Sequence, residues 1–227
     1  MTEAAARGAH DLYYLDQCGV APALPLRAPA LPLRYTWARE GTRPLARYEA
    51  PQGRRVNVLG AFAPFGPQPR FVHESRLASG GKLDSVGLLD FICHEIVGLR
   101  GGYGALTSLA SDPTVATARA TRLAIRRARR GVPATVVLDN YGVHHSRVVK
   151  AVLPTLEALG VSFYYLPPYS PKLNRIEPEW HALKYHRLAH CSFTTGPALK
   201  AAVDTALASR AAELTPSHST RHLLEAA

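Results

Sequence analysis

The fold class of this 227-residue chain is decided by residues 134–166, ATVVLDNYGVHHSRVVKAVLPTLEALGVSFYYL. The stretch opens with a β-branched run that ends in an acid, as in a strand buried on both faces. Residues 147–160 then read as a helix that contains Pro154 and ends at Gly160. Residues 161–166 read as a second apolar strand. Strand, helix and strand in this order predict a parallel pair joined by a right-handed crossover, and hence an α/β fold.

Further strands are expected in the N-terminal part of the chain. Residues 11–20, DLYYLDQCGV, have the aromatic and aliphatic density of a buried strand, with an acid, Asp16, set inside it. Residues 54–66 and 69–77 read as two more strands separated by Gly and Pro. Together these segments predict an antiparallel meander.

Helices are expected on either side of the central α/β unit. Apolar spacing predicts a helix over 82–99, with a Gly-rich break at 101–108 after it. A rigid Pro-rich loop at 167–174 precedes residues 176–190, which resume helical periodicity. The apolar stripe of this late helix consists of Ile176, Trp180 and Leu183.

Composition excludes several classes of protein. The 47% of hydrophobic residues can fill a core, and no apolar run approaches the roughly 18 residues of a membrane helix. The N-terminus lacks the basic and apolar segments of a signal peptide, so a cytoplasmic, nucleoid-associated protein is expected. Cys18, Cys93 and Cys191 are odd in number and include no CxxC, which argues against a disulfide framework or a zinc site.

The chain is basic, with 27 Lys and Arg against 17 Asp and Glu and a formal net charge of +10. Basic chains favour polyanions because phosphate neutralisation releases counterions, so nucleic acid is the expected class of partner. Six arginines lie within residues 119–130, most of them near one face of an expected helix. That face binds phosphates or is simply solvated, and both alternatives stay open. The candidate DNA-binding residues are Arg119, Arg122, Arg126, Arg129 and Arg130.

Three acids stand out by position: Asp16 within the first strand, Asp139 at the end of a central strand, and Glu177 at the start of a late helix. Acids that converge from such elements can hold two divalent cations, which activate a water or a 3′-hydroxyl for phosphodiester chemistry. For two of these acids a structural role is the alternative to metal binding. Asp139 could cap the turn that follows it, and Glu177 could form a capping box with Asn174.

Two motifs resemble the catalytic core of mariner-like bacterial insertion-sequence transposases: LDNYGVHHS at 138–146 and LPPYSPKLNRIEPEW at 166–180. The resemblance extends back to DLYYLDQCG and YTWAREGTRP and covers roughly residues 9–190. It implies a ribonuclease-H-like α/β fold, a mixed five-stranded sheet flanked by helices that is shared with retroviral integrases. It also implies DNA strand cleavage and strand transfer with two magnesium or manganese ions.

Carried over residue by residue, the family's acidic triad falls on Asp16, Asp139 and Glu177, the acids already singled out by position. These three are therefore the predicted catalytic and metal-binding residues. The Pro-Tyr-Ser-Pro block is implied to position the helix of Glu177, and Lys184 joins the candidate DNA-binding residues. The implied supporting residues are Asn140, His144, Tyr169, Ser170, Pro171, Asn174 and Trp180.

Two neighbouring acids are excluded from the predicted triad. Glu177 and Glu179 point about 200° apart on a helix, so only one can face the metals. The family's Ile-Glu-x-x-Trp spacing implies that it is Glu177. Asp11 lies an odd number of residues before Asp16, and on a strand this offset places it on the opposite face.

The sequence departs from the family at Gln17, where Glu is common, at Arg175, where Pro is common, and in its N-terminal region. We expect the helix-turn-helix that reads transposon ends to be absent from this chain. We expect residues 1–10 to be a remnant of a linking helix, residues 11–190 the catalytic domain, and residues 191–227 a C-terminal helix and tail.

The expected partners are double-stranded DNA, as transposon ends and target, a second copy of the chain and a separately encoded helix-turn-helix part. A catalytically silent DNA-binding remnant of a transposase and a ribonuclease-H-like nuclease are the alternative functions. No membrane partner is expected.

The heptad APALPLR occurs twice in succession at 21–34, as APALPLRAPALPLR. Two copies are too few for a repeat architecture, which needs at least about three. A Pro-rich ligand is the functional alternative. Removing one copy gives about the spacing that the resemblance implies between Asp16 and the Tyr-Thr-Trp segment, so the second copy reads as an insertion in a loop.

Deletion of residues 28–34 should be nearly neutral, because seven extra residues in a surface loop cost on the order of 1 kcal/mol or less. Thermal denaturation checks this expectation. A fall in melting temperature well beyond about 4 °C would show that the segment belongs to the core.

Overall fold

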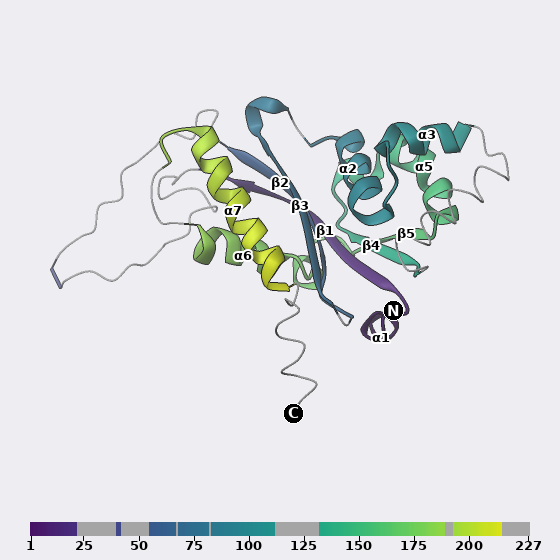
Figure 1. Ribbon diagram of the computed structural model, residues 1–227, viewed down its shortest axis with the longest axis horizontal. Helices are drawn as coiled ribbons and strands as arrows, with labels where there is room; N and C mark the ends of the chain where they lie inside the picture. The colour runs from purple at the N-terminus through teal and green to yellow at the C-terminus, as the bar shows by residue number, and fades with distance from the viewer. Residues whose placement is uncertain are drawn as a thin grey trace.

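The computed structural model describes residues 1–21, 40–41, 55–66, 68–81, 83–111, 132–188 and 193–214 (Figure 1). Of the duplicated heptad it describes Ala21 alone, and of the Tyr-Thr-Trp segment residues 40–41. The five candidate arginines between 119 and 130 and the expected tail lie outside the described residues.

A five-stranded mixed sheet forms the centre of the fold, with the strand order β3-β2-β1-β4-β5. β1 pairs antiparallel with β2 and parallel with β4, β2 pairs antiparallel with β3, and β4 pairs parallel with β5. This is the predicted ribonuclease-H-like arrangement, with the meander and the parallel crossover both confirmed. The strands are β1 (Asp11–Val20), β2 (Val56–Ala63), β3 (Arg70–Leu77), β4 (Ala134–Leu138) and β5 (Val161–Tyr165).

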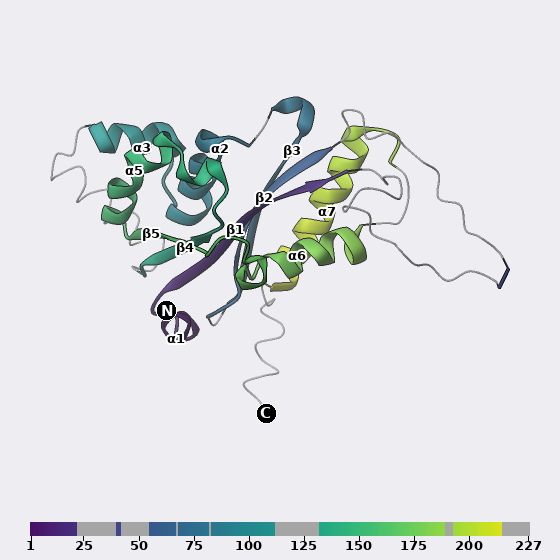
Figure 2. The ribbon, with the colours of Figure 1, turned by 180° about the vertical axis from the view of Figure 1, so that it is seen from behind.

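Strand β1 divides the apolar residues between two cores because its side chains alternate between the faces of the sheet. Tyr13 and Leu15 pack in the core covered by α2 (Ser85–Phe91), α3 (Gly102–Ser111) and α5 (Arg147–Ala158). Leu12 and Tyr14 pack in the core covered by α6 (Glu177–Ala182) and α7 (Gly196–Leu214). Figures 1 and 2 show these two groups of helices on opposite sides of the sheet. The short α1 (Thr2–Ala6) precedes β1.

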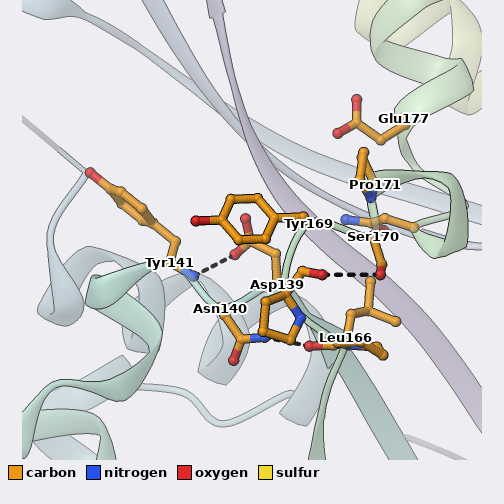
Figure 3. A pocket seen from close by; sticks show the side chains of 11 residues that line it. Asp139, Asn140, Tyr141, Leu166, Tyr169, Ser170, Pro171 and Glu177 are labelled. Atoms are coloured by element: carbon orange, nitrogen blue, oxygen red, sulfur yellow. Dashed lines mark hydrogen bonds between the residues drawn. The ribbon is translucent and has the colours of Figure 1, made fainter.

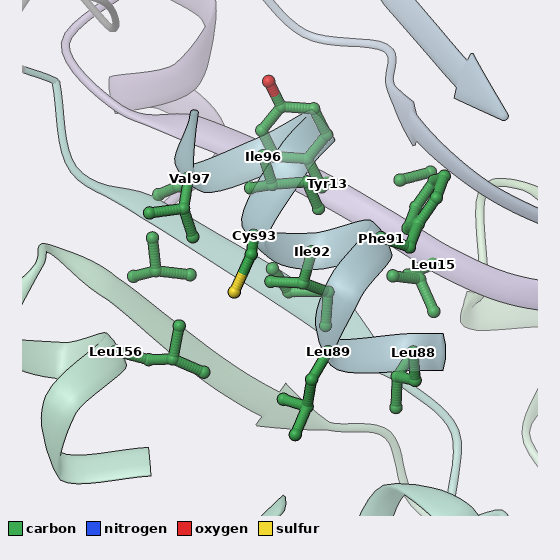
Figure 4. Packing of buried hydrophobic residues seen from close by; sticks show 14 of the residues in the cluster. Tyr13, Leu15, Leu88, Leu89, Phe91, Ile92, Cys93, Ile96, Val97 and Leu156 are labelled. Atoms are coloured by element: carbon green, nitrogen blue, oxygen red, sulfur yellow. The ribbon is translucent and has the colours of Figure 1, made fainter. Parts of the chain in front are cut away.

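The predicted helix over 82–99 occurs in two parts. Asp84 caps α2 by accepting a hydrogen bond from the Gly87 amide at 2.9 Å. The chain then continues as a π-helix, Ile92–Val97, which ends at Gly98 with a φ of 73°. Leu88, Leu89, Ile92 and Cys93 from this segment are fully buried (Figure 4). Burial raises the pKa of the Cys93 thiol to about 12, as for an unreactive core residue.

The predicted Gly-rich break at 101–108 is wrong, because α3 occupies most of it. Two tertiary contacts explain the helix. The carboxylate of Asp90 accepts a hydrogen bond from the Tyr103 amide at 2.6 Å, and Leu106 is fully buried. Gly102 permits the approach, since a Cβ there would lie 2.3 Å from Asp90 Oδ1. Local propensity is overridden by these partners, which lie elsewhere in the sequence.

The crossover from β4 to β5 runs through α5, as predicted. The Ser146 hydroxyl caps α5 by accepting a hydrogen bond from the Val149 amide, and Gly160, with a φ of 83°, follows the helix. Pro154 is accommodated inside it. No helix in the described part of the chain is both long and apolar enough to span a bilayer.

The terminal helix expected within residues 191–227 is α7, and an ion-pair network joins it to the α6 segment. Arg210 of α7 donates two hydrogen bonds of 2.8 Å to the carboxylate of Glu179. Arg187 and Glu213 form a second bidentate pair, with both N–O distances at 2.7 Å. Because Glu179 is only 11% exposed, its pair with Arg210 is shielded from solvent more than a typical surface salt bridge.

The Glu179–Arg210 pair should contribute about 1–2 kcal/mol of coupling free energy, between the values of exposed and buried pairs. Glu179→Gln and Arg210→Gln should each lower the melting temperature by roughly 2–6 °C. The double variant should lose less than the sum of the two. Strictly additive losses in thermal unfolding would contradict the coupling.

Candidate active site

The two aspartates of the predicted triad extend from neighbouring parallel strands. Tyr14 of β1 lies opposite Val137 of β4, and Asp16 and Asp139 each follow two residues later. Tyr14 and Val137 belong to the core under α6 and α7, so the two-residue period directs both acids toward that face. The strand register therefore brings the two carboxylates to the same face of the sheet, at the carboxyl end of β4.

Glu177, the first residue of α6, lies at the same end of the sheet. Together with Asp139 it lines a pocket of about 420 Å³, between the turn after β4 and the loop after β5 (Figure 3). Asp16 is not part of this lining and lies beside it, next to Trp180. The pocket is lined by Asp139, Asn140, Tyr141, Leu166, Pro167, Pro168, Tyr169, Ser170, Pro171, Asn174 and Glu177.

The three acids interact through their charges. Burial, together with the negative charges of Glu177 and Asp139, raises the pKa of Asp16 to about 6, against the lowering effect of hydrogen bonds from the Gln17 amide and Trp180. The pKa of Asp139 is lowered instead, mainly by its hydrogen bond with His144. In this site Asp139 is therefore held in its ionised form, whereas the ionised form of Asp16 is disfavoured.

The fit of these acids to divalent metal can be judged from their chemistry and their spacing. Carboxylate oxygens are the hard ligands that magnesium and manganese prefer, and a cation would relieve the repulsion at Asp16. In the described part of the chain, however, no three His, Cys, Asp or Glu side chains are grouped closely enough to hold an ion. The donor set fits a divalent metal, whereas its present spacing is wider than a formed metal site.

The turn after β4 fixes Asp139 through several hydrogen bonds. Its Oδ1 accepts one from the Tyr141 amide at 3.0 Å and lies 2.9 Å from Nδ1 of His144. His144 is only 1% exposed, which is unusual for histidine, and the Tyr165 hydroxyl donates to its carbonyl at 3.0 Å. The bond from Tyr141 is the turn cap that the sequence allowed, and Asp139 faces the pocket while making it.

Asn140 ties this turn to β5. Its side-chain amide donates to the Leu166 carbonyl, just after β5, and its Oδ1 lies 3.0 Å from Nε2 of His145. The ring of His145 stacks on Tyr165 with centroids 4.3 Å apart. The predicted supporting residues Asn140 and His144 thus hold the turn that carries Asp139.

The Pro-rich loop supports the start of α6 through its backbone. Tyr169 adopts a φ of 56°, and its fully exposed side chain lines the mouth of the pocket. The Ser170 hydroxyl donates to the Pro168 carbonyl at 3.2 Å, and the 3₁₀ turn Pro171–Leu173 leads to the buried Asn174. Because no side chain caps the start of α6, the capping box between Asn174 and Glu177 is wrong.

Trp180 connects α6 to the central strand. Ile176, Trp180 and Leu183 are buried, which confirms the predicted apolar stripe. The indole Nε1 of Trp180 donates a hydrogen bond to Oδ2 of Asp16 at 3.1 Å. Further polar contacts join the same parts of the chain: Arg175 with Tyr14, and Lys184 with Cys18.

The excluded acids lie elsewhere, as expected. Glu179 is bound to Arg210, and Asp11 is paired with Arg70, whose guanidinium lies 5.6 Å from the ring centre of Tyr13 on the opposite face from Asp16. Lys184, a predicted DNA-binding residue, is half-buried beside Cys18, and its role toward DNA stays a prediction.

Sequence reasoning missed Gly60 of β2. It lies opposite Asp16 in the sheet, and a Cβ at this position would lie 2.5 Å from Cη2 of Trp180. An isolated glycine inside a strand signals a close approach. That signal was present in the sequence, but nothing in it identified the partner.

Comparisons with known proteins found a matching family model and solved structures of similar fold. Residues 114–200, which include Asp139 and Glu177, match the family model of DDE superfamily endonucleases. No curated protein matches the chain.

Two solved structures share the fold. The Mos1 strand transfer complex has a TM-score of 0.50 and 16% identity, over 88% of this chain and 48% of that chain. The Mos1 mariner paired-end complex with Mn has a TM-score of 0.52 and 15% identity, over 91% and 50%. The chain thus spans about half the length of the Mos1 protein. Residues 114–200 are thus similar to DDE superfamily endonucleases, and the fold is similar to that of the Mos1 mariner transposase.

Proposed function

We propose that the chain is the catalytic domain of a transposase that cleaves DNA strands and transfers them to a target, with Asp16, Asp139 and Glu177 as catalytic residues. The observation that carries the proposal is the convergence of three carboxylates at one end of the sheet, where two of them act electrostatically on the third. The match to DDE superfamily endonucleases supports phosphodiester cleavage. The proposed catalytic domain comprises residues 11–190, with residues 1–10 as a linking segment before it.

The three carboxylates would hold two magnesium or manganese ions, and a manganese-containing complex of Mos1 supports this choice of metal. Such ions activate a water or a 3′-hydroxyl and neutralise charge on the leaving oxygen. Carboxylates bind them in the ionised form. The His144 and Tyr141 contacts, which lower the pKa of Asp139, keep that residue ionised.

The protein's own contribution is the orientation of the acids. Trp180 holds one oxygen of Asp16, the turn after β4 holds Asp139, and the Pro-rich loop leads Glu177 to the pocket. Pro178 is compatible with the first turn of α6, where the backbone amides lack helical partners anyway. DNA, as transposon ends and target, is the proposed substrate, and the net charge of +10 favours its approach.

Asp16→Asn, Asp139→Asn and Glu177→Gln should each reduce magnesium-dependent nicking by at least about a hundredfold, because each removes a charged oxygen and preserves side-chain size. The measurement is cleavage of labelled transposon-end DNA with an end-recognition domain supplied, alongside thermal denaturation. Glu179→Gln is the matched control and should retain nicking, since Glu179 binds Arg210 outside the pocket.

Wild-type nicking by Glu177→Gln would refute its catalytic assignment. A parent chain that binds DNA without nicking it under any metal would favour the alternative of a catalytically silent remnant.

DNA binding should depend steeply on salt and little on sequence, because phosphate contacts supply the affinity. Replacing Arg122, Arg126 and Arg129 by alanine should reduce the slope of log affinity against log salt by up to about three. Titrations of labelled duplex at several salt concentrations measure this slope. An unchanged slope would assign these arginines to a solvated face.

A further inference from the structure

We propose that Gly60 and Trp180 form a positioning pair that fixes the carboxylate of Asp16. The inference rests on the proposed function, because it assigns these two residues to the geometry of a proposed catalytic acid. Neither residue belongs to the lining of the pocket that contains Asp139 and Glu177.

The first part of the argument is the hydrogen bond from Trp180. The tryptophan is 3% exposed, and its indole N–H is a donor only, so its burial requires an acceptor. Oδ2 of Asp16, 3.1 Å away, is that acceptor. The bond joins α6 to the centre of β1 and restricts rotation of the Asp16 side chain.

The second part is the absence of a side chain at position 60. Gly60 lies directly opposite Asp16 in the antiparallel β1–β2 pair, and the indole lies over it. A Cβ there would be 2.5 Å from Cη2 and 3.1 Å from Cζ2 of Trp180, and 3.4 Å from Cδ1 of Ile176. The first two atoms belong to the edge of the indole that carries the N–H group. The space above Gly60 therefore sets how close this edge comes to Asp16.

Backbone conformation does not account for this glycine. Its φ lies outside the left-handed region, so any residue could adopt its backbone geometry. Glycine inside a strand costs roughly 0.5–1 kcal/mol relative to alanine. The close approach of the indole is the feature that requires glycine at this position.

The rest of the environment prevents the indole from moving aside without cost. Phe71 of β3 packs against Trp180 edge to face, with ring centres 5.9 Å apart. A methyl group at position 60 would push the indole by roughly 1 Å to restore an ordinary contact. That displacement is enough to lengthen or break the bond to Asp16. Displacements of this size at a catalytic group reduce rates by as much as about a hundredfold.

The test compares Gly60→Ala, which displaces the indole, with Trp180→Phe, which removes its N–H group. Each should lower kcat for transposon-end nicking by roughly ten- to a hundredfold while KM for DNA changes by less than about twofold. The double variant should be no slower than the slower single variant, because Phe lacks the atoms that collide with residue 60. Gly104→Ala is the matched control, since nothing lies within 4 Å of the added methyl group.

A second readout does not depend on cleavage. In a Trp37→Phe background, Trp180 is the one remaining tryptophan of the chain, and its indole N–H resonance reports the bond to Asp16. The resonance should be protected from solvent exchange in this background and in Gly104→Ala. It should lose that protection and shift in Gly60→Ala and in Asp16→Ala.

The outcomes separate the positioning pair from the proposed function. If the parent chain does not nick DNA, the proposed function fails, and the resonance still tests the pair. Loss of protection in Gly60→Ala supports the pair. An unchanged indole resonance in Gly60→Ala overturns the positioning pair. A loss of kcat in the double variant that equals the product of the two single losses also overturns it. If Gly60→Ala does not fold, Gly60→Ala/Trp180→Phe should fold, because the collision is gone, and failure of both overturns the proposal.

Discussion

The structure depends on the pairing of β1 with a strand at each of its edges, antiparallel on one side and parallel on the other. A strand in this position has no solvent-facing edge, and both of its faces are covered by helices. Because side chains alternate along β1, Tyr13 and Leu15 lie on one face of the sheet and Leu12 and Tyr14 on the other. The same alternation places Asp16 on the face under α6. The parallel register with β4 then sets the level at which Asp139 leaves the sheet. The relative position of the two aspartates thus follows from backbone pairing.

An acid inside a buried strand must find partners, because a poorly solvated carboxylate is costly. Asp16 receives hydrogen bonds from the Gln17 amide and from Trp180, and Gly60 leaves the room that the indole needs. The helix that supplies the tryptophan also carries Glu177 and, two residues on, Glu179, which binds α7 through Arg210. One face of α6 is therefore fixed to the sheet and another to the terminal helix. Glu177 is the first residue of this helix, and neither attachment involves Glu177 itself.

Much of this arrangement could be predicted from the sequence, because it is encoded locally. The apolar runs of β1, β4 and β5, the glycine stop of α5, and the stripe of α6 are readable from neighbouring residues alone. Helix α3 was missed because it is stabilised by Asp90 and by the burial of Leu106, which glycine-rich composition conceals. The partners of Trp180 and Glu179 are 164 and 31 residues away in the chain, and a single sequence does not show such pairings. Gln17 and Arg175, where the resembled family commonly has Glu and Pro, leave the three acids in place. The side chain of Arg175 contacts Tyr14.

The energetics of Asp16 bear on why three acids share this end of the sheet. An acid whose pKa is raised on folding makes the fold less stable as pH rises from its unfolded value toward its folded one, because the unfolded chain ionises more readily. For Asp16 that interval runs from 3.8 to about 6, so at neutral pH its ionised carboxylate opposes folding. The negative charges of Glu177 and Asp139 add to this destabilisation of the fold, and an apolar residue at position 16 would remove it. An arrangement that weakens the fold at neutral pH is explained by what it can bind, and a cation between carboxylates is the ligand that would reverse the sign of their interaction.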